Sequence, residues 1–407
     1  MTFDYTYKLM STVLGKTTSF VRKSIFGTIV LFFVVTILQI FTGFLDGPLG
    51  IVTTRPTQPP NLDKCAVANN TFGKIPSLKI PSLTLATGTN AKFSSDKPSK
   101  EFPQFPSALN VYKLDKIIEG LGDVDKARAT AVSLGFPEFG GVTTQEIIRW
   151  QSADERRVFS FDKTTHIWEL TSNYGSSNYS MLNASFSTYP SVAQLILRNI
   201  QTSESNYSNP DIEYDYILRK FDRSFESVTQ ISKGNILKMK FFKVLDIAEC
   251  KDSSDKKVPI PAKVYAPEYK DQSYTASVTG QGIDLTKDLI SFNLREVKLS
   301  KTNGVYTSKT MDEAFLDLQN NKGVLYWILL EGNNSYGTYK ELNIEMFEIA
   351  VAKTSLVYVE PQKYIDNDES TFYIQPFFRF EGKAKTTDGK IADFIFLVPA
   401  LKADSYS

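Results

Sequence analysis

The sequence contains very little of the residues on which most catalysis and metal binding at neutral pH depend. It has one histidine, His166, and two cysteines, Cys65 and Cys250, among 407 residues. A Ser-His-Asp triad or a multi-histidine zinc site therefore has almost nothing to build on. Two cysteines also exclude a disulfide-dense scaffold. The 46 Lys and Arg residues barely exceed the 45 Asp and Glu residues. This balance lacks the basic surplus of nucleic-acid-binding chains, so we expect no nucleic-acid partner.

The chain does contain one long hydrophobic run without a charge, Ile25–Leu45. As a helix that rises 1.5 Å per residue, it would extend over about 30 Å, the thickness of the hydrocarbon core of a bilayer. A signal peptide would have a shorter apolar core and a small-residue cleavage site, which Thr42–Gly47 does not supply. The run predicts an uncleaved transmembrane helix whose partner is the lipid bilayer.

The charges that flank this run predict its orientation. Four basic residues precede it, and two basic residues lie in the twenty residues after it: Lys8, Lys16, Arg22 and Lys23, then Arg55 and Lys64. Lys and Arg are enriched in cytoplasmic segments next to membrane helices. We therefore expect residues 1–24 to form a cytoplasmic tail at the cell membrane and the main domain to lie outside.

Residues 46–107 have a different composition, with nine of the chain's 18 prolines between Gly47 and Pro106. Proline fixes φ and removes a hydrogen-bond donor, so this region predicts an extended stem. It includes a tandem repeat, Lys74–Leu78 and Lys79–Leu83, which is either a spacer or a docking segment. Cys65 in the stem either pairs with Cys250 or both remain free thiols.

The remaining residues predict an α+β fold in two modules outside the membrane, 108–189 and 190–407. Three helices are expected, at Asp123–Gly135, Val192–Ile200 and Met311–Asn321. Ser191 with Gln194 and Thr310 with Glu313 have the spacing of capping boxes, and Gly135 suits the left-handed position that ends a helix. Segments of alternating apolar and polar residues predict antiparallel strands. These segments are 147–150, 157–161, 166–170, 212–217, 236–242, 273–278, 289–294, 323–330, 342–351, 356–359, 372–380 and 393–398. Helices followed by antiparallel strands favour helices packed on sheets over a doubly wound parallel sheet.

Four segments in residues 190–401 occur in an order that resembles a known group of proteins. They are Ile236–Phe242, Thr310–Gly323, Tyr373–Gly382 and Phe396–Leu401. The order is similar to that in the extracytoplasmic domains of bacterial YycH/YycI-like regulatory proteins and PepSY-type modules. The resemblance implies a single-pass envelope protein with α+β modules outside the membrane. It also implies a regulatory partner, such as a sensor kinase or a peptidase, and no catalytic residues.

A search for catalytic patterns gives only weak candidates. The Asp-x-Asp pairs 123/125 and 366/368 match metal–nucleotide sites of glycosyltransferases, but a helix start explains the first pair better, and the second pair fits an exposed loop or a weak calcium site. Ser94–Lys97 and Ser253–Lys256 have the Ser-x-x-Lys spacing without its companion motifs. His166 is expected to be half-buried inside a strand. Five glycosylation sequons begin at Asn69, Asn178, Asn183, Asn206 and Asn333. We therefore predict no catalytic, cofactor-binding or metal-ligating residue, and no cofactor.

These observations leave three functional hypotheses. The first is a membrane-anchored extracytoplasmic protein that binds a protein partner in the envelope and catalyses nothing. The second is a type II membrane enzyme, such as a metal-dependent glycosyltransferase, which has the same anchor, stem and domain plan. The third is a structural component of the envelope that assembles with copies of itself.

Overall fold

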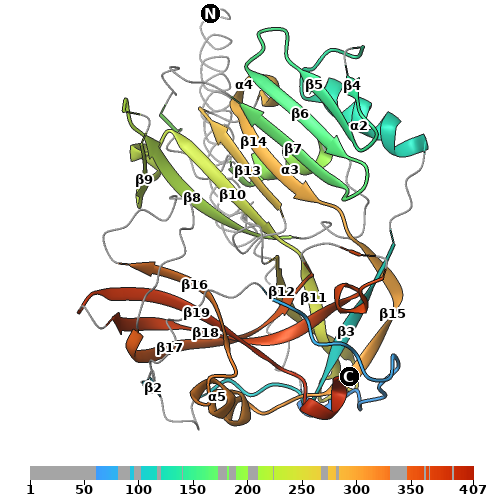
Figure 1. The fold of residues 1–407 in the computed structure, drawn as a ribbon, viewed down its shortest axis with the longest axis vertical. Coiled ribbons are helices and arrows are strands. Elements are labelled where there is room, and N and C mark those ends of the chain that lie inside the picture. Colours follow the sequence, from blue (N-terminus) through green and yellow to red (C-terminus); the bar gives the residue numbers. More distant parts are fainter. Residues whose placement is uncertain are drawn as a thin grey trace, which may run out of the picture. The chain divides into compact units, whose positions relative to one another are not determined.

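The computed structural model describes residues 61–80, 92–95, 102–116, 121–139, 141–172, 181–182, 189–199, 210–222, 224–266, 274–280, 284–330, 346–361, 364–365, 367–386 and 389–407. All of them fall in one compact unit, Gln58–Ser407. They form an α+β fold with two mostly antiparallel sheets and few helices, which confirms the predicted class (Figure 1).

The first sheet has nine strands in the order β4-β5-β6-β7-β14-β13-β10-β8-β9. Helices α2 (Leu121–Ser133) and α3 (Tyr189–Asn199) contribute buried side chains to its core, which also contains Phe159 and Trp168. The strands are β4 (Val142–Thr143), β5 (Ile147–Gln151), β6 (Arg157–Asp162), β7 (Ile167–Ser172), β8 (Asp211–Arg219), β9 (Phe225–Val228), β10 (Ile236–Phe242), β13 (Tyr274–Thr279) and β14 (Leu289–Arg295), and a short helix α4 (Leu285–Asp288) precedes β14. The predicted antiparallel arrangement of β5, β6 and β7 is confirmed.

The second sheet has ten strands, seven of them in the order β1-β11-β12-β17-β18-β19-β16. The other three strands attach to this row: β2 pairs with β17, β3 pairs with β18, and β15 pairs with β3. The pairs β12–β17 and β2–β17 are parallel. The strands are β1 (Asn61–Cys65), β2 (Lys92–Ser95), β3 (Ala108–Asp115), β11 (Val244–Lys251), β12 (Lys257–Tyr265), β15 (Lys298–Thr307), β16 (Val324–Leu330), β17 (Met346–Val359), β18 (Tyr373–Thr386) and β19 (Ile391–Pro399). Helix α5 (Met311–Gln319) packs near β19, and single 3-10 turns lie at Ile231–Lys233, Glu369–Thr371 and Ala403–Ser405.

Strand β18 is buried on both of its faces. Phe378 and Phe380 belong to the main core of the ten-stranded sheet. Phe377, which points to the opposite face, belongs to a smaller core with Phe242 and Tyr265. Both alternating sets of side chains on this strand are therefore packed, because other elements cover each face.

The local signals for helix ends are partly confirmed. Thr310 and Glu313 form the predicted capping box at the start of α5, and Gly135 adopts a positive φ of 84° after α2. Helix α3 begins at Tyr189, so Ser191 lies inside it instead of capping it. Asp123 lies in the first turn of α2, after its start, where a carboxylate still meets the positive end of the helix dipole.

The expected position of His166 inside a strand is wrong. His166 has a positive φ of 52° in the turn before β7, and only 2% of its surface is exposed. Its ring packs edge-on against Phe161, and its carbonyl accepts a hydrogen bond from the Glu296 N–H. The histidine is therefore part of the packed end of a hairpin.

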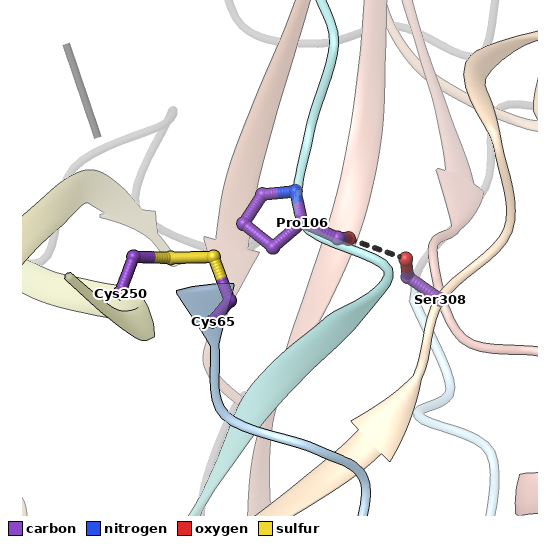
Figure 2. Close-up of a disulfide and its surroundings, with 4 residues drawn as sticks. All are labelled: Cys65, Pro106, Cys250 and Ser308. Atoms are coloured by element: carbon purple, nitrogen blue, oxygen red, sulfur yellow. Dashed lines mark hydrogen bonds between the residues drawn. A yellow bond between two sulfur atoms is a disulfide. The ribbon is translucent and has the colours of Figure 1, made fainter. Parts of the chain in front are cut away.

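The predicted stem is corrected by the structure, because its described residues belong to the folded unit. Strand β1 pairs with β11, and a disulfide joins Cys65 to Cys250 beside this pair (Figure 2). Strand β2 pairs with β17, and the Pro106 carbonyl accepts a hydrogen bond of 2.7 Å from Ser308 Oγ. Ile75, in the first repeat, is fully buried in the main core. Apolar side chains between the prolines thus favour packing over a solvated spacer.

The predicted boundary between residues 189 and 190 does not separate the two sheets. Strand β7 of the first predicted module pairs with β14 of the second. Strand β3, which comes before β7 in the chain, pairs with β15 and β18 in the other sheet. The chain therefore alternates between the sheets, and neither sheet is a continuous segment.

Among the described residues, no helix is long and apolar enough to cross a bilayer. The predicted cytoplasmic tail at 1–24 and the predicted transmembrane helix at 25–45 lie outside these residues.

Candidate functional site

A cavity of about 560 Å³ lies where side chains of the two sheets meet. Strands β8 and β10 of the nine-stranded sheet contribute one wall, and β11, β12, β17 and β18 of the ten-stranded sheet contribute the others. The residues around it are Asp211, Glu213, Lys240, Phe242, Val244, Pro261, Ala262, Lys263, Tyr265, Lys353, Ser355, Leu356, Val357, Arg379 and Glu381. We call this cavity the junction pocket.

Two aromatic rings and two cations form a continuous row in the junction pocket. The ring centroids of Phe242 and Tyr265 are 5.2 Å apart. The Arg379 guanidinium carbon lies 4.5 Å from the Tyr265 ring, and Lys263 Nζ lies 4.7 Å from the Phe242 ring. Cation–π contacts at these distances stabilise a charge beside an apolar surface. The row gives the pocket an aromatic middle and a charged group at each end.

The end at Arg379 carries more positive than negative charge. Arg379 Nε lies 3.1 Å from Glu381 Oε1, and Lys353 Nζ lies 3.5 Å from the same oxygen. Two cations therefore share one carboxylate. The Arg379 side chain is only 11% exposed, and its Nε–H is too poorly aligned with Glu381 to form a hydrogen bond within the described residues. A buried donor without a partner is costly, so this end favours an added acceptor such as a carboxylate.

The end at Lys263 contains paired charges of both signs. Lys263 Nζ lies 2.6 Å from Glu213 Oε1 and 3.0 Å from Asp211 Oδ2. Burial by itself would lower the pKa of Lys263, but the hydrogen bonds to Glu213 and Asp211 raise it above its ordinary value. The lysine is held in its charged form between two carboxylates, and Lys240, which also lines the pocket, is paired with Asp215 at 2.9 Å.

Lys243, the residue directly after Phe242, forms a buried ion pair with Glu360. Lys243, which links β10 to β11, donates to Glu360 Oε2 at 2.8 Å, and both side chains are almost completely buried. The Glu360 N–H bonds to the carbonyl of Tyr265. Burial lowers the pKa of Lys243, although the charge of Glu360 opposes this effect. The pair connects the two segments that carry the aromatic rings, so we regard Lys243 and Glu360 as positioning residues.

The weak candidates from the sequence lie elsewhere. Asp368 caps the 3-10 turn at Glu369–Thr371, accepting from the Ser370 N–H and hydroxyl, and the hydroxyl contact lowers the pKa of Asp368. Asp366 lies outside the described residues. Asp125 is paired with Arg128 at 3.2 Å on the surface of α2. Within the part of the chain that the structure describes, no group of three or more His, Cys, Asp or Glu residues could hold a metal ion.

The Ser-x-x-Lys motifs and the sequons are also separate from the pocket. Ser253–Lys256 forms the turn between β11 and β12, where Asp252 accepts from the Ser254 N–H. Ser94 lies on β2, and its Oγ donates to the Ile349 carbonyl. Asn69 is exposed, and its Oδ1 accepts from Thr71 and from the Val305 N–H. The other four sequons lie outside the described residues.

The sequence reasoning missed the residues of the junction pocket, although a signal for some of them exists. Arg379 interrupts an apolar run between Phe378 and Phe380, and Lys263 lies between Ala262 and Val264. A cation inside an otherwise apolar strand must find a counter-charge or an aromatic face. The pattern identifies such residues as unusual, but it does not say which ones come together.

A comparison of the chain with protein-family models and with curated proteins gives no match.

Proposed function

We propose that this chain is a single-pass, membrane-anchored extracytoplasmic protein that binds a protein partner in the envelope through the junction pocket. Residues 25–45 would form the anchor, with the N-terminus in the cytoplasm. The observation that carries the proposal is the junction pocket, in which an aromatic middle lies between an end with a positive excess at Arg379 and an end with paired charges at Lys263. Aromatic and Arg side chains in a partly desolvated site are the groups that contribute most to recognition.

The disulfide between Cys65 and Cys250 supports the location outside the cytoplasm. Such bonds persist in oxidising compartments and are rare where thiols are kept reduced. A regulator of the YycH/YycI or PepSY type, with two α+β modules outside the membrane, would agree with this proposal.

The proposed location outside the cytoplasm can be tested by measuring whether Cys65 and Cys250 are oxidised. Intact cells that express the full chain are treated with a thiol-blocking reagent and then denatured, and a mass-tagged maleimide is added with and without reductant. We expect mass tags on Cys65 and Cys250 only after reduction. A variant that lacks residues 25–45 stays in the cytoplasm and provides the control with free thiols. Equal blocking of both cysteines in the full chain and in this variant would contradict the proposed location.

Partner binding has a separate test in the native membrane. A photo-crosslinking amino acid replaces Ser355 in the pocket, and a second variant carries it at Val142, an exposed position on β4. We expect one discrete adduct from position 355 that is absent from position 142. Identical adducts at both positions, or none at position 355, would contradict a partner at the pocket.

A further inference from the structure

The junction pocket adjoins a gap between two strands of the ten-stranded sheet. Strands β12 and β17 pair in parallel at Val264–Tyr358 and Tyr265–Val359. On the same edge, β17 pairs with β2 at residues 348–351. Between these two pairings, no described residue pairs with the edge of β17 from Ala352 to Val357. At about 3.3 Å per residue, this edge is about 20 Å long.

Main-chain groups of β17 face this gap. The Glu360 N–H points to β12, where it bonds to the Tyr265 carbonyl. Because main-chain groups alternate along a strand, Leu356 and Thr354 turn their N–H and C=O groups to the same side. The side chain of Leu356 lies in the main core, and so does that of Ala262 on β12. Both residues also line the pocket, and they lie on the two strands that border the gap. The pocket therefore continues into the gap between β12 and β17.

An occupant of the gap would meet two different surfaces. A strand placed beside β17 sends alternate side chains to opposite faces of the sheet. One face offers Ser355 and the positive end of the pocket at Arg379 and Lys353. The other face continues into the main core at Leu356 and Ala262. A segment that complements both surfaces is an extended strand with a carboxylate on one face and aliphatic side chains on the other.

We infer that the junction pocket receives an extended segment of the partner protein as an added β-strand along Ala352–Val357. An acidic side chain of that segment would bind Arg379 and Lys353. This inference rests on the proposed function and specifies its partner. Main-chain hydrogen bonds to Thr354 and Leu356 would supply affinity, and the pocket would supply selectivity for acidic and aliphatic alternation. The unbonded Nε–H of Arg379 would gain an acceptor.

The test uses the full chain in lipid nanodiscs and a fluorescent hexapeptide, Thr-Val-Glu-Val-Thr-Val, with blocked ends. Two matched probes separate the contributions. In one, Gln replaces Glu, and in the other, N-methyl groups block one main-chain edge. We expect the Gln probe and the N-methylated probe each to bind at least about tenfold more weakly than the parent, since each loses hydrogen bonds at a partly buried site. The parent probe should also compete with the adduct formed from position 355.

Two variants of the chain locate the charged contact. Arg379→Gln should weaken the parent probe about tenfold and leave the Gln probe unchanged, because the two substitutions remove the same interaction. Lys385→Gln is the matched control, since Lys385 is an exposed cation on the same strand outside the pocket. It should change binding less than twofold.

The outcomes distinguish this inference from the proposed function. Equal binding of the N-methylated and parent probes, or no binding of any probe at millimolar concentration, overturns strand addition. The partner adduct from position 355 would then still support the proposed function. An adduct from position 355 to the chain's own residues 96–101 also overturns the inference, because the chain itself would fill the gap. An adduct to a second copy of the chain favours self-assembly and overturns it as well.

Discussion

Replacing Lys243 by methionine is expected to lower the free energy of unfolding by about 3 to 5 kcal/mol. The substitution keeps an unbranched side chain of similar length but removes the ammonium that lies 2.8 Å from Glu360 Oε2. Glu360 has no exposed surface, and its Oε1 has no hydrogen-bond partner among the described residues. Its buried charge would then lose its direct ion-pair partner. The loss is large compared with the total stability of a typical domain, about 5 to 15 kcal/mol.

The double variant Lys243→Met, Glu360→Leu is the control for this reasoning. It replaces the whole ion pair by apolar side chains, which is often neutral or stabilising for a buried pair. We expect its stability to lie within about 1 kcal/mol of the original chain. The assay is urea unfolding of the full chain in detergent, followed by tryptophan fluorescence from Trp168 and the other two tryptophans. A single variant that loses less than about 1 kcal/mol, or a double variant that is less stable than the single one, would refute the argument.

Three further predictions follow from the fold. Replacing Cys65 and Cys250 by serine should cost about 5 kcal/mol in the same assay, because the disulfide joins positions 185 residues apart and restricts the unfolded chain; an unchanged midpoint would contradict this. Ile75→Ala should cost about 2 to 5 kcal/mol, whereas Val67→Ala, at an 84% exposed position, should cost about 0.5 kcal/mol or less; equal losses would show that residues 61–80 do not pack as described. Burial lowers the pKa of Lys243 below its ordinary value of 10.5. Between the lowered pKa and pH 10.5, the unfolded chain therefore binds more protons than the folded chain, and the free energy of unfolding should rise with pH. This pH dependence should vanish in the double variant.

Local sequence patterns predicted three of the helices and part of the strands, but β3, β11, β12 and β15 were not among the predicted segments. The predicted segment 236–242 coincides with β10, and the predicted segment 157–161 with all but one residue of β6. Both are governed by the alternation of neighbouring side chains, which is a property of the segment itself. The capping box at Thr310 is equally local, since its two hydrogen bonds join residues three positions apart.

The composition of residues 46–107 predicted the wrong environment because proline content describes the backbone and not its surroundings. Nothing local indicates that Ile75 packs in the core or that Cys65 meets Cys250. Cys250 lies 185 positions after Cys65, and Ile75 pairs with Tyr406 near the end of the sequence.

The sequence by itself determined the α+β class, the position of three helices and of many strands, and the scarcity of residues for His- or Cys-dependent chemistry. These properties follow from composition and from periodicity over a few residues. The tertiary structure decided which strands share a sheet, how the chain alternates between the two sheets, and that Phe242, Tyr265 and Arg379 meet in one pocket. The physical reason is that strand pairing and ion pairing bring together residues far apart in the chain, and no short-range pattern records which partner each strand or charge will find.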